Sequence, residues 1–235
     1  MTAQTDIRVP ETPAGDLPPR RWTRVALQAV IAVALVLIGG GAAVALGIGR
    51  GPSAPTADSV DAGFAWDMSR HHLQGVEMAN LAQGRSTDPV ILSLAFDISA
   101  TQTNQVGRMQ GWLSLWGLPN TSSRPPMEWM AGASADHSMD GMDMSTPGAL
   151  MPGMATDQEM AQLRSLSGRA FDVQFLRLMI RHHQGGLKMA QDAEANAQEA
   201  PVRTLARSIA ETQTAEVHTM AQLLAERGGT PLPAP

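Results

Sequence analysis

The stretches FAWDMSRHHLQGVEMA at residues 64–79 and FLRLMIRHHQGGLKMA at residues 175–190 decide the fold, because they are two copies of one pattern. They lie 111 positions apart, and at this offset 19 of the 54 residue pairs between 64–117 and 175–228 are identical. Shared residues recur at spacings of three, four and seven, which mark one face of a helix. The sequence therefore predicts a duplicated helical unit in which each copy needs the other to bury its apolar face.

Proline and glycine divide each copy into a helical hairpin. Pro89 and Pro201 stand where the first turn of a second helix tolerates proline. Gly117 and Gly228 close the copies at positions suited to a C-terminal cap. Two hairpins give four helices, for which an all-α four-helix bundle is the natural arrangement. The predicted helices span residues 61–83, 89–116, 168–196 and 201–227.

The N-terminal part of the chain contains one long apolar run. Residues 25–49 carry no charge and are numerous enough to cross about 30 Å of hydrocarbon, so they predict a transmembrane helix. Four arginines precede the run, and the positive-inside rule therefore places the N-terminus in the cytoplasm and the bundle outside. A cleaved signal peptide, which would leave a secreted domain, is the alternative, because Ala43-Val44-Ala45 has small residues at a signal-peptidase spacing.

These features predict the organisation of the whole chain. The expected parts are a cytoplasmic tail at 1–24, a transmembrane anchor at 25–49, a linker at 50–60, the duplicated bundle at 61–228 with a Met-rich loop at 119–156, and a tail at 229–235.

The composition limits the kinds of ligand that the chain can bind. It contains no cysteine, so disulfides and thiolate metal sites are excluded, but it contains 15 methionines. A soft-metal site here must therefore use imidazole and thioether groups. After Arg50 the chain holds 12 Lys and Arg against 19 Asp and Glu, which argues against a nucleic-acid partner and favours a cation.

Each copy turns histidine and methionine to one face of its first helix. At about 100° per residue, Met68, His71, His72, Gly75 and Met78 fall within an arc of about 120°, and the second copy repeats this arc. Imidazole and thioether together suit copper, above all Cu(I). The candidate ligands are Met68, His71, His72, Met78, Met179, His182, His183 and Met189, with Met109 and Met220 as candidates that join the two stripes.

Packing is an alternative for each of these residues taken alone, since a methionine stripe at helical spacing is most often core. Repetition of two adjacent imidazoles on an apolar face favours the ligand interpretation, because every buried ring nitrogen requires a partner. A glycine in the middle of both helices, Gly75 and Gly186, indicates that another group approaches this face closely. His218 is a weaker candidate, because its counterpart in the first copy is Gly107.

The segment between the copies is rich in Gly, Ser, Pro and Met, and it predicts a long, partly disordered loop. One interpretation of its methionines is flexible capture of Cu(I) by spaced thioethers. The other is that they reflect random drift of a low-complexity sequence and have no function. The sequence Thr156-Asp157-Gln158-Glu159 resembles a capping box and predicts a short helix before Ser167. The candidate loop ligands are Met127, Met130, His137, Met139, Met142, Met144, Met151 and Met154.

The pattern Phe-x3-Met-x2-His-His-x2-Gly-x2-Met-Ala, present twice around a Met-Pro-Gly-Met sequence, resembles the domain of unknown function 305 family over nearly all of residues 61–228. The resemblance implies a ferritin-like four-helix bundle and copper binding in the bacterial envelope. It carries over to Met68, His71, His72, Met78, Met179, His182, His183 and Met189. The family often has an acidic residue where Gln105 stands, whereas Glu216 keeps it in the second copy, so the two halves are not expected to be equivalent.

Three functions compete at this point. The first is non-catalytic binding of copper outside the membrane for sequestration, buffering or transfer, with a metal ion and the membrane as partners and no protein partner identified. The second is a ferritin-like metal oxidase, but no Glu is followed three residues later by His as a di-iron site requires. The third is a structural or interaction domain of the envelope that binds no metal.

Overall fold

The computed structural model describes residues 20–45, 53–133 and 148–235. The chain divides into two units, Met1–Ser53 and Ala54–Pro235. Helix α1 (Arg20–Ala45) belongs to the first unit. Its stretch Arg21–Ala43 is long and apolar enough to cross a membrane, and it is the one helix of the described residues with that property. The helix begins before the predicted anchor at 25–49, and the last four residues of that prediction lie outside the described residues.

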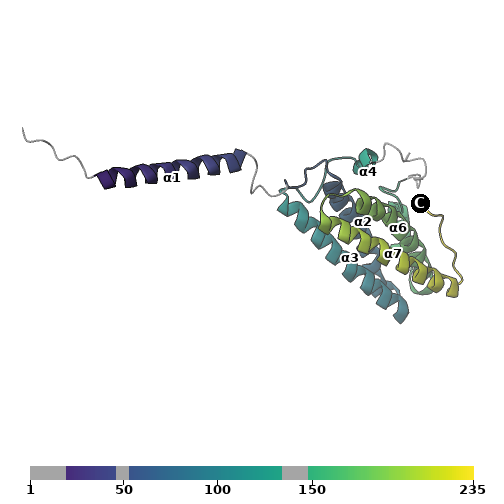
Figure 1. Ribbon diagram of the computed structural model, residues 1–235. Helices are drawn as coiled ribbons and strands as arrows, with labels where there is room; N and C mark the ends of the chain where they lie inside the picture. The colour runs from purple at the N-terminus through teal and green to yellow at the C-terminus, as the bar shows by residue number, and fades with distance from the viewer. Residues whose placement is uncertain (1–19, 46–52, 134–147) are drawn as a thin grey trace, which may run out of the picture. The chain divides into compact units, whose positions relative to one another are not determined.

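The second unit is built from four long helices that pack side by side (Figure 1). The hairpin pairs α2 with α3 and α6 with α7 are in contact, and α2 also packs against α6, which joins the two hairpins. The described residues contain helices and no strands, so the predicted all-α bundle is confirmed. The four helices are α2 (Val60–Arg85), α3 (Pro89–Leu115), α6 (Gly168–Asn196) and α7 (Ala200–Glu226).

Local signals in the sequence explain where these helices begin and end. The Asp88 side chain accepts a hydrogen bond from the backbone of Val90, with Pro89 in the first turn of α3. Gly117 and Gly228 follow α3 and α7 with φ values of 72° and 66°, a left-handed conformation that glycine adopts without strain. The hairpin boundaries predicted from proline and glycine are therefore confirmed.

Helices α2 and α6 run in opposite directions along their contact. The Asp61 carboxylate at the start of α2 accepts hydrogen bonds from the backbone of Gln198 and Glu199, which follow the end of α6. At the other end of α2, Arg85 donates to the carbonyl of Leu166, which precedes α6. This arrangement brings the middle of α2 against the middle of α6, where both His-His pairs lie.

The described parts of the segment between the hairpins are more ordered than the sequence suggests. It contains a short helix, α4 (Glu128–Ala133), where no helical period is visible in the sequence. Helix α5 (Asp157–Ser165) begins at the predicted capping box, in which Thr156 and Glu159 bond each other's backbone. The prediction of a loop over 119–156 is therefore wrong for residues 128–133. His137, Met139, Met142 and Met144 lie outside the described residues.

Candidate metal centre

All ten candidate ligands of the helices lie in the interior of the bundle. Their faces on α2 and α6 meet, and the second helices α3 and α7 add one methionine each. None has any exposed surface, so the helical arc predicted from the sequence corresponds to the buried faces. The residues are Met68, His71, His72, Met78, Met109, Met179, His182, His183, Met189 and Met220.

The four imidazoles follow one another across the middle of the bundle. His71 and His182 lie at the centre, with ring centroids 3.9 Å apart and an interplanar angle of 33°. His72 flanks His71 at 6.4 Å, and His183 flanks His182 at 6.1 Å. We call these four rings the imidazole row. Its members come from two helices, and the row is symmetric under the 111-residue offset of the repeat.

Every ring in the row uses its Nε2 atom in a hydrogen bond to an oxygen. His71 contacts the Pro152 carbonyl at 3.2 Å, and His182 contacts the His71 carbonyl at 2.9 Å. His72 contacts Oε1 of Gln105 at 2.7 Å, and His183 contacts a carboxylate oxygen of Glu216 at 2.7 Å. Carbonyl, amide and carboxylate oxygens accept hydrogen bonds, so each Nε2 carries the proton.

The opposite nitrogen of each ring, Nδ1, is therefore unprotonated and has a lone pair. All four Nδ1 atoms are buried and have no hydrogen-bond partner. A neutral imidazole whose one nitrogen donates to an oxygen while the other keeps a free lone pair is the usual state of a metal-binding histidine. The row thus offers four oriented nitrogen donors.

Burial favours the neutral form of three of these rings. It is the main cause that lowers the pKa of His71 to about 4, against the hydrogen bond with Pro152. Burial, reinforced by the nearby His71, lowers the pKa of His72 to about 3. Burial and then His71 hold the pKa of His182 well below its usual value. At neutral pH these three imidazoles can bind a metal ion without first losing a proton.

The two mid-helix glycines explain why the rings fit together. A Cβ atom on Gly75 would overlap the Gln102 side chain and lie 3.1 Å from Cε1 of His182. A Cβ atom on Gly186 would lie 2.8 Å from Oε1 of Gln213 and 3.2 Å from Cε1 of His71. The close approach predicted from the recurring glycines is confirmed, and the group that approaches is the histidine of the opposite helix together with a glutamine.

Gln102 and Gln213 are each the middle residue of a Thr-Gln-Thr sequence that occurs in both copies. The sequence pattern predicted no role for them. The Oε1 atom of Gln102 and both amide atoms of Gln213 are buried without a partner. Buried polar atoms are normally satisfied by protein, water or an ion. The surroundings of the row therefore contain further donors and acceptors that the protein alone leaves unsatisfied.

The six methionines of the four long helices divide into two equivalent sets. Met68, Met109 and Met189 belong to one packed cluster, and Met78, Met179 and Met220 belong to another. Each methionine of one set has its repeat counterpart, 111 positions away, in the other set: Met68 pairs with Met179, Met109 with Met220, and Met78 with Met189. His71 and His72 stand between Met68 and Met78 along α2, so the imidazole row lies between two sets of three thioethers.

A strap formed by residues 151–155 covers the row on one side. Its Pro152 carbonyl accepts the hydrogen bond from His71, and Gln74 both donates to the Ala155 carbonyl and accepts from its backbone N–H. A Cβ atom on Gly185 would lie 2.5 Å from the carbonyl carbon of Pro152, so glycine is required there. The strap thereby fixes the orientation of His71, a role that its Met-Pro-Gly-Met sequence does not reveal.

The loop methionines in the described ranges are packed in the core. Met127, Met130, Met151 and Met154 are 2%, 6%, 2% and 6% exposed and belong to the same cluster as Met68. Packing in an apolar cluster is therefore a third interpretation of these four methionines, beside copper capture and low-complexity drift. The segment is ordered enough to bury them.

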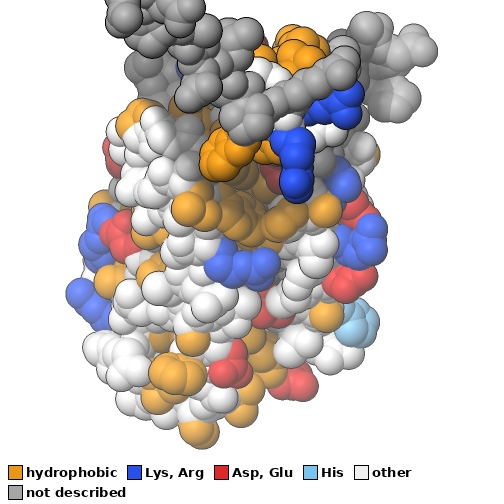
Figure 2. Space-filling model, turned by 60° about the vertical axis from the view of Figure 1, so that its left-hand side comes forward, with side chains coloured by type: hydrophobic (Ala, Val, Ile, Leu, Met, Phe, Trp, Pro, Cys, Tyr) orange, Lys and Arg blue, Asp and Glu red, His pale blue; other side chains and the backbone are white. Residues whose placement is uncertain are grey.

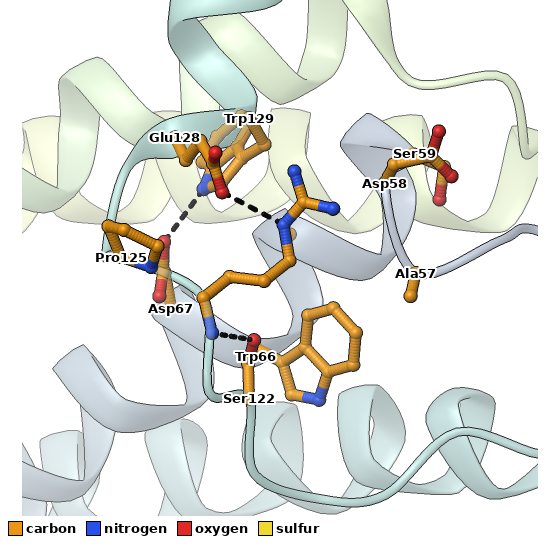
Figure 3. Close-up of a pocket in the computed structure, with 11 residues that line it drawn as sticks. Ala57, Asp58, Ser59, Trp66, Asp67, Ser122, Pro125, Glu128 and Trp129 are labelled. Carbon is orange, nitrogen blue, oxygen red and sulfur yellow. Dashed lines mark hydrogen bonds and ion pairs between the residues drawn. The ribbon is translucent and has the colours of Figure 1, made fainter.

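Asp67 anchors the first of these methionines. One carboxylate oxygen accepts hydrogen bonds from the backbone of Met127 at 2.7 Å and from Nε1 of Trp129 at 2.8 Å. Figure 3 shows the Trp129 side chain directed toward Asp67 in a pocket that both residues line. Burial is the main cause that raises the pKa of Asp67. Asp67 has no counterpart in the second copy, where Leu178 stands, so this anchor belongs to the segment between the hairpins.

The remaining candidates lie away from the row. His218 is exposed on α7 and contacts Gln222. Figure 2 shows that histidine occupies little of the face in view. This agrees with the burial of the four rings of the imidazole row, which have no exposed surface. Among residues 20–45, 53–133 and 148–235, no three His, Asp or Glu side chains gather into a ready-made metal site. A site at the row therefore requires thioether sulfur or a rotation of the rings.

Comparison with known protein families matches residues 61–224 to a family described as a domain of unknown function, DUF305. Comparison with curated protein sequences gives no match. Two crystal structures of DUF305 proteins resemble the chain. The one from Streptomyces coelicolor shares 45% identity over 76% of this chain and 99% of its own, with a TM-score of 0.66. A fragment from Deinococcus radiodurans shares 32% identity over 74% and 99%, with a TM-score of 0.59.

A third solved structure extends the comparison. It is CopM in a Cu(I)-bound form, which shares 24% identity over 72% of this chain and 98% of its own, with a TM-score of 0.54. At this identity the likeness establishes a common fold.

Proposed function

The chain belongs to the DUF305 family, and from that premise we propose that its bundle binds copper, with Cu(I) favoured, for sequestration, buffering or transfer outside the cytoplasm. The observation that carries the proposal is the set of four buried, unpartnered Nδ1 atoms in the imidazole row. An apolar core has no need of four such atoms, because each leaves a buried acceptor unsatisfied at about 1–3 kcal/mol. Metal ions bound along the row, with thioether sulfur completing their coordination, would satisfy them.

The thioethers support copper over harder metals. Methionine sulfur is a soft ligand that suits Cu(I), whereas Mg²⁺ and Ca²⁺ prefer oxygen ligands. Two sets of three buried thioethers flank the row, and the absence of cysteine leaves thioether as the soft donor. The CopM structures, described as Cu(I)-bound and Cu(II)-bound, are of a protein with this fold, which makes copper the first ion to test. We propose the ten buried histidines and methionines as the ligand set.

The N-terminal helix supports a location outside the cytoplasm. Arg21–Ala43 is apolar and long enough to span a bilayer, and arginines concentrate on its N-terminal side. The Streptomyces coelicolor relative has a name that suggests secretion. Either an uncleaved anchor or a cleaved signal would deliver the bundle to the far side of the membrane.

Competition titration with Cu(I) tests this function. The full chain in detergent is titrated against a chelator of known affinity, beside the variant His72→Gln/His183→Gln and the control His218→Gln. We expect the wild type and the control to bind alike. The double variant should bind at least about 100-fold more weakly, because loss of a ligand exceeds the 10–100-fold effect of an outer partner.

Thermal unfolding with and without copper separates this function from a purely structural role. Copper that binds the folded state at a free concentration of 100 times Kd stabilises it by about 2.7 kcal/mol. A wild-type protein that binds no Cu(I) and melts at the same temperature with or without it would leave only a structural domain.

A further inference from the structure

The two ends of the imidazole row differ in charge although they have the same geometry. At one end, His72 contacts Oε1 of Gln105 at 2.7 Å. At the other end, His183 contacts a carboxylate oxygen of Glu216 at 2.7 Å. Gln105 and Glu216 occupy the same position of the repeat, on α3 and α7. The repeat thus places a neutral acceptor at one end of the row and an anionic acceptor at the other.

This difference acts on any cation that enters the row. A carboxylate that accepts the Nε2–H of a histidine makes the other ring nitrogen more basic, which strengthens its bond to a metal. The negative charge also offsets the positive charge of the metal in a medium of low dielectric constant. The amide of Gln105 orients His72 equally well but carries no charge to offset the metal.

Other charged groups near the row do not cancel this asymmetry. The buried Arg181 guanidinium, which precedes His182, is paired with Glu159 through contacts of 2.9 and 2.6 Å. Arg70, its counterpart before His71, is exposed to solvent. The Glu216 side chain is 22% exposed, so solvent screens part but not all of its charge.

We propose that Glu216 is a positioning residue that makes the His183 end of the row bind the first copper ion, and bind it more tightly than the His72 end. This inference rests on the proposed function and adds to it an order of filling. A second ion, or an ion on its way through the protein, then occupies the weaker end beside Gln105.

An exchange of the two acceptors tests the proposal with little change in shape. The variants are Glu216→Gln, Gln105→Glu, and the double exchange Gln105→Glu/Glu216→Gln. An amide is tolerated at this position of the fold, because Gln105 already makes the same 2.7 Å contact in the first copy. Thermal unfolding without metal checks that the variants fold.

Two readouts follow the filling of the row by Cu(I) in the full chain. Competition titration should show that Glu216→Gln binds its first ion about 10-fold more weakly, the lower limit for loss of an outer partner. Histidine-ring NMR during the titration should show the His183 nitrogens shifting before those of His72 in the wild type. In the double exchange the order should reverse, a result that a purely structural role of Glu216 cannot produce.

The outcomes separate this inference from the function on which it rests. If the wild type binds no copper, the proposed function fails and the inference fails with it. If the wild type binds copper but Glu216→Gln binds with unchanged affinity and both rings shift together in every variant, only the inference is overturned.

Discussion

Both the two histidine helices, α2 and α6, and the segment between the hairpins carry candidate copper ligands in the sequence. In the structure, the two regions differ in how these side chains are satisfied. On α2 and α6 the four imidazoles leave buried nitrogen atoms without partners. In the segment, Met127, Met130, Met151 and Met154 fill an apolar cluster, and a hydrogen bond to Asp67 holds the backbone of Met127. The unpartnered nitrogen atoms therefore single out the imidazoles as candidate metal ligands, whereas packing alone accounts for the burial of the segment's methionines.

The largest effect expected from this difference concerns the thioethers. Leucine has a similar volume to methionine but no sulfur, so each replacement should cost less than about 1.5 kcal/mol of stability. We expect Met68→Leu/Met109→Leu/Met189→Leu to weaken Cu(I) binding by at least about 100-fold, as measured by chelator competition. The matched control, Met127→Leu/Met130→Leu, should leave the affinity unchanged. An equal loss of Cu(I) affinity in both variants would show that the methionines of the helices and of the segment contribute alike to copper binding.

The second effect is on the stability of the metal-free protein at low pH. The folded-state pKa of His71 is about 4 and that of His72 about 3, below the unfolded value of 6.5. The unfolded state therefore binds more protons, and stability falls as the pH drops below 6.5, by up to about 1.4 kcal/mol per pH unit for each ring until its folded-state pKa is reached.

Urea unfolding at pH 7, 5.5 and 4.5 measures this dependence. The His72→Gln/His183→Gln variant should show a shallower loss, because it lacks the contribution of His72. A wild-type free energy of unfolding that stays constant over this range would contradict the buried, neutral state of His71 and His72.

The third effect is on the strap over the row. Gly185→Ala places a Cβ atom against the backbone of Pro152 and Gly153, which cannot move aside as a flexible side chain can. We expect a loss of about 3 kcal/mol, at the upper end for overpacking, in urea unfolding. Gly107→Ala in α3, where a Cβ atom meets nothing within 4 Å, should instead stabilise the protein by up to about 1 kcal/mol.

The smallest effect is at the anchor of the segment. Asp67→Asn keeps an oxygen acceptor for Met127 and Trp129 but removes its charge, so we expect a loss of about 1 kcal/mol. Copper affinity should not change, since the row lies elsewhere. Asp58→Asn, at an exposed carboxylate bonded to Thr56, is the control and should be nearly neutral. Weaker copper binding in the Asp67 variant would connect the segment to the site.

Repetition made much of this structure predictable from the sequence. The four helices, their caps and the close approach at Gly75 and Gly186 follow from features that occur twice, and the structure confirms them. The repeated Gln102 and Gln213 were visible in the same way, although their place beside the row was not. A residue that is identical in both copies contributes to the buried helical face that the two copies share.

Features that occur once could not be predicted in this way. The Pro152 carbonyl contacts His71, 81 positions away, and Asp67 accepts a hydrogen bond from Met127, 60 positions away, immediately before helix α4. Neither contact produces a periodic pattern in the sequence from which it could be predicted. Backbone carbonyls in particular are present at every residue, so composition cannot indicate which one accepts a hydrogen bond.

The most direct test of the central claim is the protonation and metal response of the four imidazoles. Long-range ¹H–¹⁵N correlation spectra of the metal-free chain identify which ring nitrogen carries the proton, and addition of Cu(I) identifies which nitrogen binds. We predict protons on Nε2 in all four rings and large copper-induced shifts at Nδ1, with His218 unaffected. Protons on Nδ1, or Nδ1 signals that stay in place when Cu(I) is bound, would contradict the account.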